Sequence, residues 1–539
     1  MNKPLKIFLV VLLLLLILSM SLTPLRSSND VWWHLKTGKV LLERNFSLPE
    51  NDIFAFTSQN IPWHNHEWLA QVLFFQVFRL GGDSEHDGLR FVIFFKFLVL
   101  LGACIFVVLK TWRETRGFPA AILAGMVAML MMRRTIYPRP PILTYLFFAF
   151  YLYIFSEYAG GRLKKKWLWI LPVLMIPWVN LHGGFMLGII AAGAYFAGSL
   201  PDVVFRKKSI RESGVPLFGG ILFACIIASL INPYTYHLYL LPGRVMSDVT
   251  LVRIIPELHS PDFFFTLSFE ALILLLLLGF GLMKKIPFSL AEALLLFFFM
   301  HYALQHVRHL PLVGIVAAPI CFRVLYDLSH TYVKDKWKNL IPWAFTGVGA
   351  LIVLYTIFNQ REGEPFFERN LKYFQGTGFY EENYPVNEAD FIIENEFKGR
   401  MFNQINDAGY LIWRMSPEHH KVFTDSRYDI FGGKFMRHEQ IIQRGYDRKV
   451  YENDKTWDEM LDYWQVNFIL ISADAPVNFL LEESNEWKLV YHRIPRYARS
   501  TRRGHKIYIR NIPENAELIK RSRLSFSAMT GKDWEDSSI

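Results

Sequence analysis

The sequence has few of the features that mark a disulfide-stabilised or nucleotide-binding protein. Its 539 residues include three cysteines, Cys104, Cys225 and Cys321, all inside apolar runs. No disulfide framework is therefore expected. We find no internal repeat, no P-loop and no Rossmann glycine fingerprint after a strand, and the GFG at Gly279 lies in an apolar run where glycine serves packing. A nucleotide-sugar or ATP substrate is therefore unsupported.

The composition instead indicates a membrane protein. Hydrophobic residues make up 52% of the chain and aromatic residues 16%, and the mean hydropathy is +0.21. Most of this chain is too apolar for a soluble protein with ordinary cores. The formal net charge of +10 does not indicate nucleic acid, because the basic residues gather in short clusters between apolar segments. This distribution is typical of cytoplasmic loops under the positive-inside rule, so we interpret the charge as a topology signal and expect no nucleic-acid partner.

The apolar runs predict eleven transmembrane helices, each of about the ~20 residues that cross a bilayer. The first run follows Lys3 and Lys6 without a small-x-small cleavage site, so we interpret it as an anchor and not as a cleaved signal peptide. The predicted helices are centred near Leu14, Leu100, Val127, Phe148, Leu174, Ala191, Phe223, Leu275, Phe297, Val316 and Val348.

Basic loops predict the orientation of these helices. The segments KTWRETR, GGRLKKKW, FRKKSIR, MKKI and KDKWK should be cytoplasmic, with the amino terminus on the same side. A long first loop, residues 23–90, and the tail would then lie on the outer face. We predict a transmembrane domain over residues 1–358 and an extracytoplasmic soluble domain over residues 359–539.

The tail has the composition of a mixed α/β domain. EADFIIENEF and WDEMLDYW have helical patterns, whereas HKVFTDSR, NFILISA, WKLVYHR and HKIYIR have the pattern of short buried strands. The fold class predicted for the whole chain is thus a polytopic α-helical membrane protein with a carboxyl-terminal soluble α/β domain. Within the tail, Asp425 and Arg427 are expected to form an ion pair that fixes a turn.

Polar residues cluster in the first loop. If residues 29–43 form a helix lying along the outer interface, Asp30, Trp33, His34 and Thr37 share one face of it. Taken singly, the tryptophans fit interfacial anchors and Asp30 fits a helix cap. The same loop carries Asp52 and the segment HNHE, with His64, His66 and Glu67. A satisfied polar network fits HNHE better than a metal site, because His-x-His lacks an assured third ligand.

Several segments together resemble a known family. These are DVWWHL and NHEWL in the first loop, followed by RTIYPRPPILTYLF, WVNLHGGF, NPY and QHVRHLP at the ends of predicted helices, and by RMFNQINDAGYLIW and VFTDSRYD in the tail. The set resembles the bacterial branch of the GT-C glycosyltransferase superfamily over almost the whole chain. It does not specify a substrate.

The resemblance implies a multi-pass protein of the cytoplasmic (inner) membrane that takes sugar from a polyprenyl-phosphate or polyprenyl-diphosphate carrier. Its acceptor would be a glycan, a lipid or a protein, and membrane lipid would surround it. Asp30 matches the first-loop Asp of the superfamily, which acts as base or orients the acceptor. A hydroxyl attacking an anomeric carbon does need a carboxylate to take its proton, and the leaving phosphate needs fixed cations.

Cations for such a phosphate are present at predicted outer boundaries. Arg133, Arg134 and Arg139 lie in one loop, and Arg308 with His309 in another. Arginine suits phosphate because its planar fork binds two oxygens, although any single arginine here also fits contact with lipid headgroups.

The candidate substrate contacts are Trp33, His34, His64, His66, Glu67, Arg134, Arg139, His182, Glu257, Arg308 and His309. His182 ends a predicted helix beside two glycines that allow a close approach, and it fits a structural histidine equally well. Glu257 and Asp262 supply acids on the outer side, and some GT-C enzymes use such a residue to help hold a metal. The sequence has no Asp-x-Asp pair, so no cofactor is established and a divalent metal stays an open alternative.

A transporter or flippase, or a non-catalytic assembly protein for lipid-linked glycans, is the alternative function. Polar residues at the outer boundary, in place of mid-membrane charges, favour the transferase.

Overall fold

The computed structural model describes residues 3–26, 28–205, 209–210, 213–263, 266–283, 288–358, 366–446, 455–493 and 504–530. Two compact units divide the chain. The first comprises Met1–Pro24, His66–Leu238 and Ile255–Gly378, and the second comprises Leu25–Asn65, Tyr239–Ile254 and Phe379–Ile539. The second unit thus joins most of the predicted outer loop to the predicted soluble domain. Much of the basic segments FRKKSIR and MKKI lies outside the described residues.

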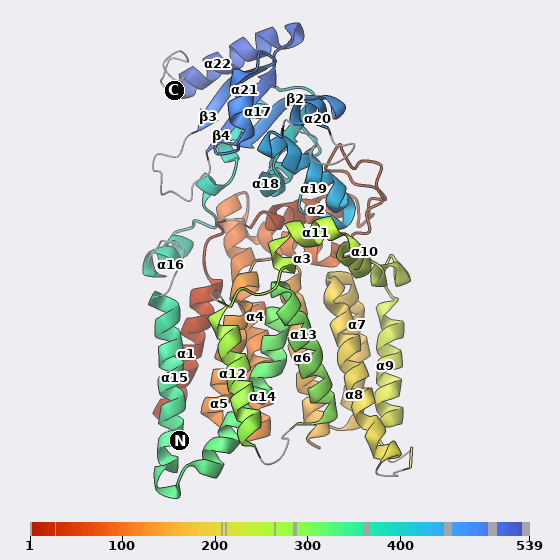
Figure 1. Ribbon diagram of the computed structural model, residues 1–539, viewed down its shortest axis with the longest axis vertical. Coiled ribbons are helices and arrows are strands. Elements are labelled where there is room, and N and C mark those ends of the chain that lie inside the picture. Colours follow the sequence, from red (N-terminus) through yellow and green to blue (C-terminus); the bar gives the residue numbers. More distant parts are fainter. Residues whose placement is uncertain are drawn as a thin grey trace. The chain divides into compact units, whose positions relative to one another are not determined.

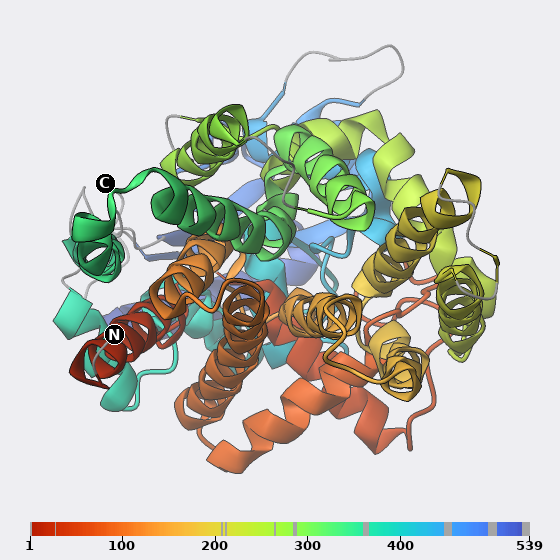
Figure 2. The ribbon, with the colours of Figure 1, turned by 90° about the horizontal axis from the view of Figure 1, so that it is seen from below.

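The first unit is a bundle of helices. Figure 1 shows most of them running side by side, and Figure 2 shows them end-on. The helices are α1 (Lys3–Ser21), α3 (Trp68–Phe78), α4 (Glu85–Thr115), α5 (Phe118–Met132), α6 (Pro141–Ala159), α7 (Ile170–Leu181), α8 (Met186–Val204), α9 (Val215–Ser229), α12 (Leu267–Leu282), α13 (Leu290–Gln305), α14 (Leu310–Tyr332), α15 (Ile341–Phe358) and α16 (Phe366–Phe374).

Seven helices of the described chain are long and apolar enough to cross a membrane when adjoining 3-10 turns are included: α1, α4, α5, α6, α8, α14 and α15. All eleven predicted centres fall within helices. Seven lie in these long helices, and the other four lie in the shorter helices α7, α9, α12 and α13. The polytopic helical fold is therefore confirmed. The number of crossings remains a prediction.

Local sequence explains where key helices begin. Ser84 accepts a hydrogen bond from the backbone N–H of Asp87 at the start of α4. Ser289 and Glu292 form a reciprocal capping box at the start of α13. Between α7 and α8 the chain leaves helical geometry at His182, which lies in extended backbone. This break presents a polar side chain at the end of otherwise apolar helices.

The second unit contains a small sheet with helices. Its elements are α2 (Asp30–Glu43), α10 (Leu241–Ser247), α11 (Val249–Ile254), α17 (Val386–Glu394), β1 (Arg400–Asn403), α18 (Ile405–Met415), α19 (Tyr428–Arg444), α20 (Trp457–Tyr463), β2 (Val466–Ser472), α21 (Val477–Glu483), β3 (Trp487–Arg493), β4 (His505–Arg510) and α22 (Ala516–Thr530).

The described strands pair in the order β1-β2-β4-β3, with β1 parallel to β2 and the other pairs antiparallel. Phe402 lies opposite Ile469, and Leu470 opposite Ile507. Buried apolar residues from β1, β2, β3 and β4 and from α19, α20 and α21 form the core of this unit. Consecutive residues of β2, from Phe468 to Ile471, are buried, so this central strand is covered on both faces.

The tail was predicted well, with one error. The predicted strands NFILISA, WKLVYHR and HKIYIR correspond to β2, β3 and β4, and both predicted helices are present as α17 and α20. The prediction of a strand at HKVFTDSR is wrong. This segment makes only an isolated bridge between Val422 and Ala55, and the backbone N–H of Phe423 donates to Oδ1 of Asn403. Side-chain hydrogen bonds here replace a strand ladder.

A buried histidine cluster ties β4 to α17 and α18. His505 lies with Nδ1 3.6 Å from Oε1 of Glu388 and Nε2 3.4 Å from Oδ1 of Asp407, and all three side chains are buried. Arg493 forms an ion pair with the same Glu388, with Nε 2.9 Å from Oε1. Burial alone would lower the pKa of His505, but the two carboxylates overcome this effect and raise it to about 9. The folded unit therefore favours the imidazolium form.

Candidate functional site

Asp30 is the first residue of α2, and the cap position before it is occupied by Asn29. The helix start packs closely on α18, because a Cβ at Gly409 would lie 1.9 Å from the backbone oxygen of Asn29. The glycine of the NDAGYLIW segment is therefore required for this approach. Lys36 of α2 also donates to both carboxylate oxygens of Glu418, at 2.9 and 2.8 Å. The first loop is thus held by the tail within one compact unit, so both must lie on the same side of a membrane.

The Asp30 carboxylate is oriented by a residue of the tail. Ser426 donates from Oγ to Oδ1 of Asp30 at 2.5 Å, and Trp33 Nε1 donates to the same Oγ at 3.2 Å. Since the Trp33 N–H occupies one acceptor position of the hydroxyl, the hydroxyl hydrogen is directed to Asp30. The side chain of Asp30 is partly exposed, so it remains reachable.

The neighbouring side chains of α2 differ from the predicted open face. Trp33 and His34 are buried, with ring centroids 3.7 Å apart. Thr37 donates from its hydroxyl to the backbone oxygen of Trp33 at 2.8 Å. The shared face predicted from the spacing exists, but most of it serves packing within the unit.

Next to Ser426, Arg427 pairs with two carboxylates. Its Nη1 donates to Asp52 at 2.7 Å, while its Nε and Nη2 donate to Asp425 at 2.8 and 2.5 Å. All three side chains are buried, and the guanidinium lies over the rings of Trp63 and Phe54. The predicted ion pair of Asp425 and Arg427 is therefore confirmed, and it gains Asp52 as a third member.

Burial and the Arg427 guanidinium act in opposite directions on the two carboxylates of the ion triad, and for Asp425 burial prevails and raises the pKa. Burial by itself would raise the pKa of Asp52, but the guanidinium, the Ser58 hydroxyl and the Phe54 N–H together lower it. The backbone N–H of Arg427 also donates to Asp425, at 2.9 Å. The turn that carries Ser426 is thus fixed on both sides, which positions its hydroxyl for Asp30.

A second polar group lies in the first unit, where the HNHE and NLHGGF segments meet. Glu67 Oε1 lies 3.6 Å from Nε2 of His182 and 3.8 Å from Nε2 of His66. A Cβ at Gly183 would lie 3.4 Å from the His66 ring, an ordinary contact distance, so the ring packs directly on this turn. His182 is therefore a neighbour of His66 and Glu67, which lie far from it in sequence.

Hydrogen bonds assign the tautomer of His182. Its Nδ1 accepts from the backbone N–H of Gly184 at 2.9 Å and lies 2.8 Å from the hydroxyl oxygen of Thr144. Trp178 donates to that same hydroxyl oxygen at 3.0 Å, so the Thr144 hydrogen points to His182. The ring hydrogen must then reside on Nε2, facing Glu67. This pair offers one donor and one acceptor to a polar ligand.

The predicted cations meet one predicted acid in the same unit. Arg139 Nη2 lies 2.9 Å from Oε1 of Glu257. Arg308 is exposed and interacts electrostatically with Arg139, Glu257 and the hydroxyl of Tyr145. Two guanidinium groups with one carboxylate leave an excess of positive charge, as an anion site requires.

Backbone contacts hold this cluster together. His306 Nδ1 donates to the backbone oxygen of Leu258 at 2.6 Å, and the N–H of Val307 donates to the oxygen of His259 at 2.9 Å. These bonds fix the segment that carries Glu257 beside the turn that carries Arg308.

The remaining predicted residues occupy less decisive positions. Arg134 is exposed in the 3-10 turn Arg133–Thr135. The ring centroid of His309 lies 5.8 Å from that of His306. His64 belongs to the second unit and is partly exposed. Among the described residues, no group of three or more His, Cys, Asp or Glu side chains has an arrangement that could hold a metal ion.

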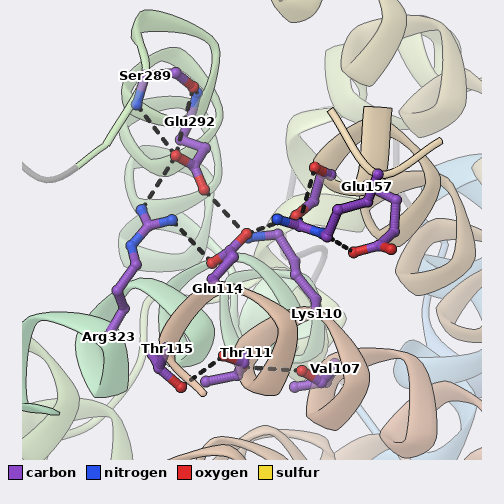
Figure 3. A network of polar contacts seen from close by, with 11 residues as sticks. Val107, Lys110, Thr111, Glu114, Thr115, Glu157, Ser289, Glu292 and Arg323 are labelled. Atoms are coloured by element: carbon purple, nitrogen blue, oxygen red, sulfur yellow. Dashed lines mark hydrogen bonds and ion pairs between the residues drawn. The ribbon is translucent and has the colours of Figure 1, made fainter. Parts of the chain in front are cut away.

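Buried charges also link helices α4, α6, α13 and α14 within the first unit. Lys110 of α4 bridges Glu114 and Glu292 at 2.7 and 3.1 Å, and Arg323 of α14 contacts the same two carboxylates at 2.8 and 3.1 Å (Figure 3). Glu157 of α6 pairs with arginines in the same region. Part of the basic charge interpreted as a topology signal therefore also clamps α4, α6, α13 and α14.

Four contributors were not identified as contacts from the sequence: Ser426, Thr144, Tyr145 and His306. Each lies inside a segment that carries the resemblance. Only the folded chain reveals them, because their partners lie more than a turn away in sequence.

Comparison with known proteins identifies the fold. No protein-family model matches the sequence, and no curated protein matches it. Among solved structures, the oligosaccharyltransferase of Archaeoglobus fulgidus in the apo form has 11% identity and a TM-score of 0.53, covering 87% of this chain and 70% of that one. The same enzyme tethered to an acceptor peptide gives 12% and 0.51, with 87% and 69% covered. ArnT from Cupriavidus metallidurans, bound to undecaprenyl phosphate, gives 12% and 0.49, with 95% and 98% covered.

The matches to the oligosaccharyltransferase confirm the predicted resemblance at the level of the fold. The chain is a multi-pass membrane protein with the fold of GT-C glycosyltransferases. The A. fulgidus enzyme has also been solved with Zn and sulfate, with a TM-score of 0.52.

Proposed function

We propose that this protein is an integral-membrane glycosyltransferase that moves a sugar from a polyprenyl-(di)phosphate carrier to an acceptor at the outer face of the cytoplasmic membrane. The observation that carries the proposal is the cluster of Arg139, Arg308, Glu257 and Tyr145 at one end of the membrane helices. A lipid-linked phosphate would find its cations there. Arginine supplies a permanent charge and two parallel hydrogen bonds for such a group.

Glu67 and His182 have a complementary role in the proposal. The Nε2–H of His182 and the Glu67 carboxylate offer a donor and an acceptor within 4 Å of each other. A sugar hydroxyl is both donor and acceptor, so it can satisfy both groups. His66 adds a second ring to this group.

Asp30 is the proposed base or acceptor-orienting group. In the reaction, an acceptor oxygen bonds to the anomeric carbon while the bond from that carbon to the phosphate oxygen breaks. The acceptor proton passes to the carboxylate, and the polyprenyl phosphate leaves as an anion stabilised by cations. The Ser426 hydroxyl holds Asp30 in one orientation, which supports this role.

The carrier can be tested by identifying lipid that copurifies with the protein. Mass spectrometry of wild-type protein should detect a polyprenyl phosphate or its glycosylated form, and Arg308→Ala should retain much less of it. Arg79→Ala is the matched control, since Arg79 is exposed in the same unit and contacts only Gln76 at 3.4 Å among its recorded hydrogen bonds. Because Arg308 is also exposed, its loss should leave no cavity and should not unfold the protein.

Two results would count against the proposal. Equal lipid content in folded wild type, Arg308→Ala and Arg79→Ala would assign Arg308 to headgroup contact. A complete glycan carrier bound by a protein that shows no transfer with it would favour the flippase or assembly alternative.

A further inference from the structure

The helix α16 presents an apolar face to the outside of the first unit. Phe367, Leu371 and Phe374 are 79%, 54% and 62% exposed, respectively. Their spacing of four and three residues places them on one side of a helix with 3.6 residues per turn. In a water-soluble setting such a row of large apolar side chains would be unfavourable.

The opposite face of α16 is docked on the bundle. Arg369 is buried and donates from Nη2 to the backbone oxygen of Ser19 at 2.9 Å. Tyr373 is buried as well and donates from its hydroxyl to the backbone oxygen of Arg90 at 3.1 Å. The orientation of the helix is thus set by two side chains, which direct the row of apolar residues away from the protein.

These contacts also define the depth of α16. Ser19 belongs to the last turn of α1, and Arg90 belongs to the second turn of α4, and both helices are candidate membrane spans. The helix is therefore attached where two spans meet the boundary of the bilayer. Its charged Glu368 and Lys372, which pair at 3.7 Å, lie on a different side from the apolar row.

From this placement we propose that α16 is an interfacial helix whose Phe367, Leu371 and Phe374 insert among the lipids around the bundle. The occupant of the face is lipid, because the same depth of α1 and α4 is already a membrane boundary. An amphipathic helix held there buries its apolar side at the junction of headgroups and acyl chains. The helix would then fix, at the membrane surface, the point where the chain passes from the first unit to the second at Gly378 and Phe379.

The test uses spin labels on the full-length protein in lipid nanodiscs. Single cysteines at Leu371 and at Glu368 place a label on the apolar and the charged side of the same helix. The native Cys104, Cys225 and Cys321 are buried, and unmutated protein measures their background labelling. Collision with oxygen, which concentrates in lipid, and with a water-soluble nickel complex is then compared by power saturation.

We expect the Leu371 label to collide more with oxygen and the Glu368 label more with nickel. Greater nickel access at both positions would place the helix in water and overturn the proposal. An immobile Leu371 label inaccessible to either reagent would also overturn it, because protein would then cover the face. This experiment is independent of any transferase activity.

Discussion

Replacement of Arg427 by methionine should destabilise the second unit strongly. The substitution keeps an apolar side chain of similar length. Among the described residues, it removes the positive charge that pairs with two buried carboxylates, Asp52 and Asp425. Breaking a buried ion pair by removing one partner costs about 3–5 kcal/mol. Loss of the guanidinium from the rings of Trp63 and Phe54 adds to this cost.

The loss can be expressed as a shift in melting temperature. In a domain of 150–250 residues, a change of 1 kcal/mol moves Tm by roughly 2–4 °C. The expected decrease is therefore on the order of 10 °C. Hydrogen exchange should accelerate locally in residues 52–58, because Asp52 also accepts from the backbone N–H groups of Phe54 and Ala55.

A matched control separates the ion triad from a general effect of charge. Arg414 makes two hydrogen bonds to Asp390, at 2.9 and 2.7 Å, but both side chains are largely exposed. Arg414→Met should cost no more than about 1 kcal/mol, since exposed pairs contribute little. The inference would be refuted if Arg427→Met and Arg414→Met had the same Tm and hydrogen exchange in residues 52–58 did not change. The ion triad would then not stabilise the second unit.

Two further predictions concern the second unit. The pKa of His505 is raised to about 9, so its stabilising effect is complete below pH ~6.5 and is lost as the pH rises through 9. In thermal unfolding of the purified protein, the free energy of unfolding should decrease by about 3 kcal/mol between pH 6 and 10. A His505→Gln variant that shows the same decrease would exclude the histidine cluster as its source. Ser426→Ala should lower transfer about 10-fold, because the Asp30 carboxylate loses the hydroxyl that orients it. Ser426→Thr should restore the rate, and equal rates for both variants would refute the positioning role.

Periodicity predicted the parts of the fold that depend on one segment at a time. Runs of about 20 apolar residues identified the membrane helices, and buried strands of six or seven residues identified β2, β3 and β4. The prediction of a strand at HKVFTDSR was wrong because Phe423 bonds to Asn403 and Arg427 bonds to Asp52. Both partners are distant in sequence. A strand pattern cannot reveal such side-chain competition.

The candidate site shows the same limit. Local motifs selected Asp30, Glu67, His182, Arg139 and Arg308, and the structure joins Glu67 to His182 and Arg139 to Glu257. It also assigns part of the predicted surface to packing, as the buried Trp33 and His34 demonstrate. Which polar residues reach a ligand depends on contacts between elements, and these are not encoded in the spacing of one motif.

The most direct test of the proposed chemistry is the transfer rate of Asp30→Asn, measured with the lipid carrier identified from the wild-type protein and its acceptor. The substitution preserves the shape of the side chain and its position beside Ser426, but it removes the carboxylate charge. We predict unchanged expression and lipid content, with transfer lowered by about 10²–10⁴-fold, as is typical for loss of an acid–base group. Transfer at the wild-type rate would contradict the assignment of Asp30 as the catalytic carboxylate.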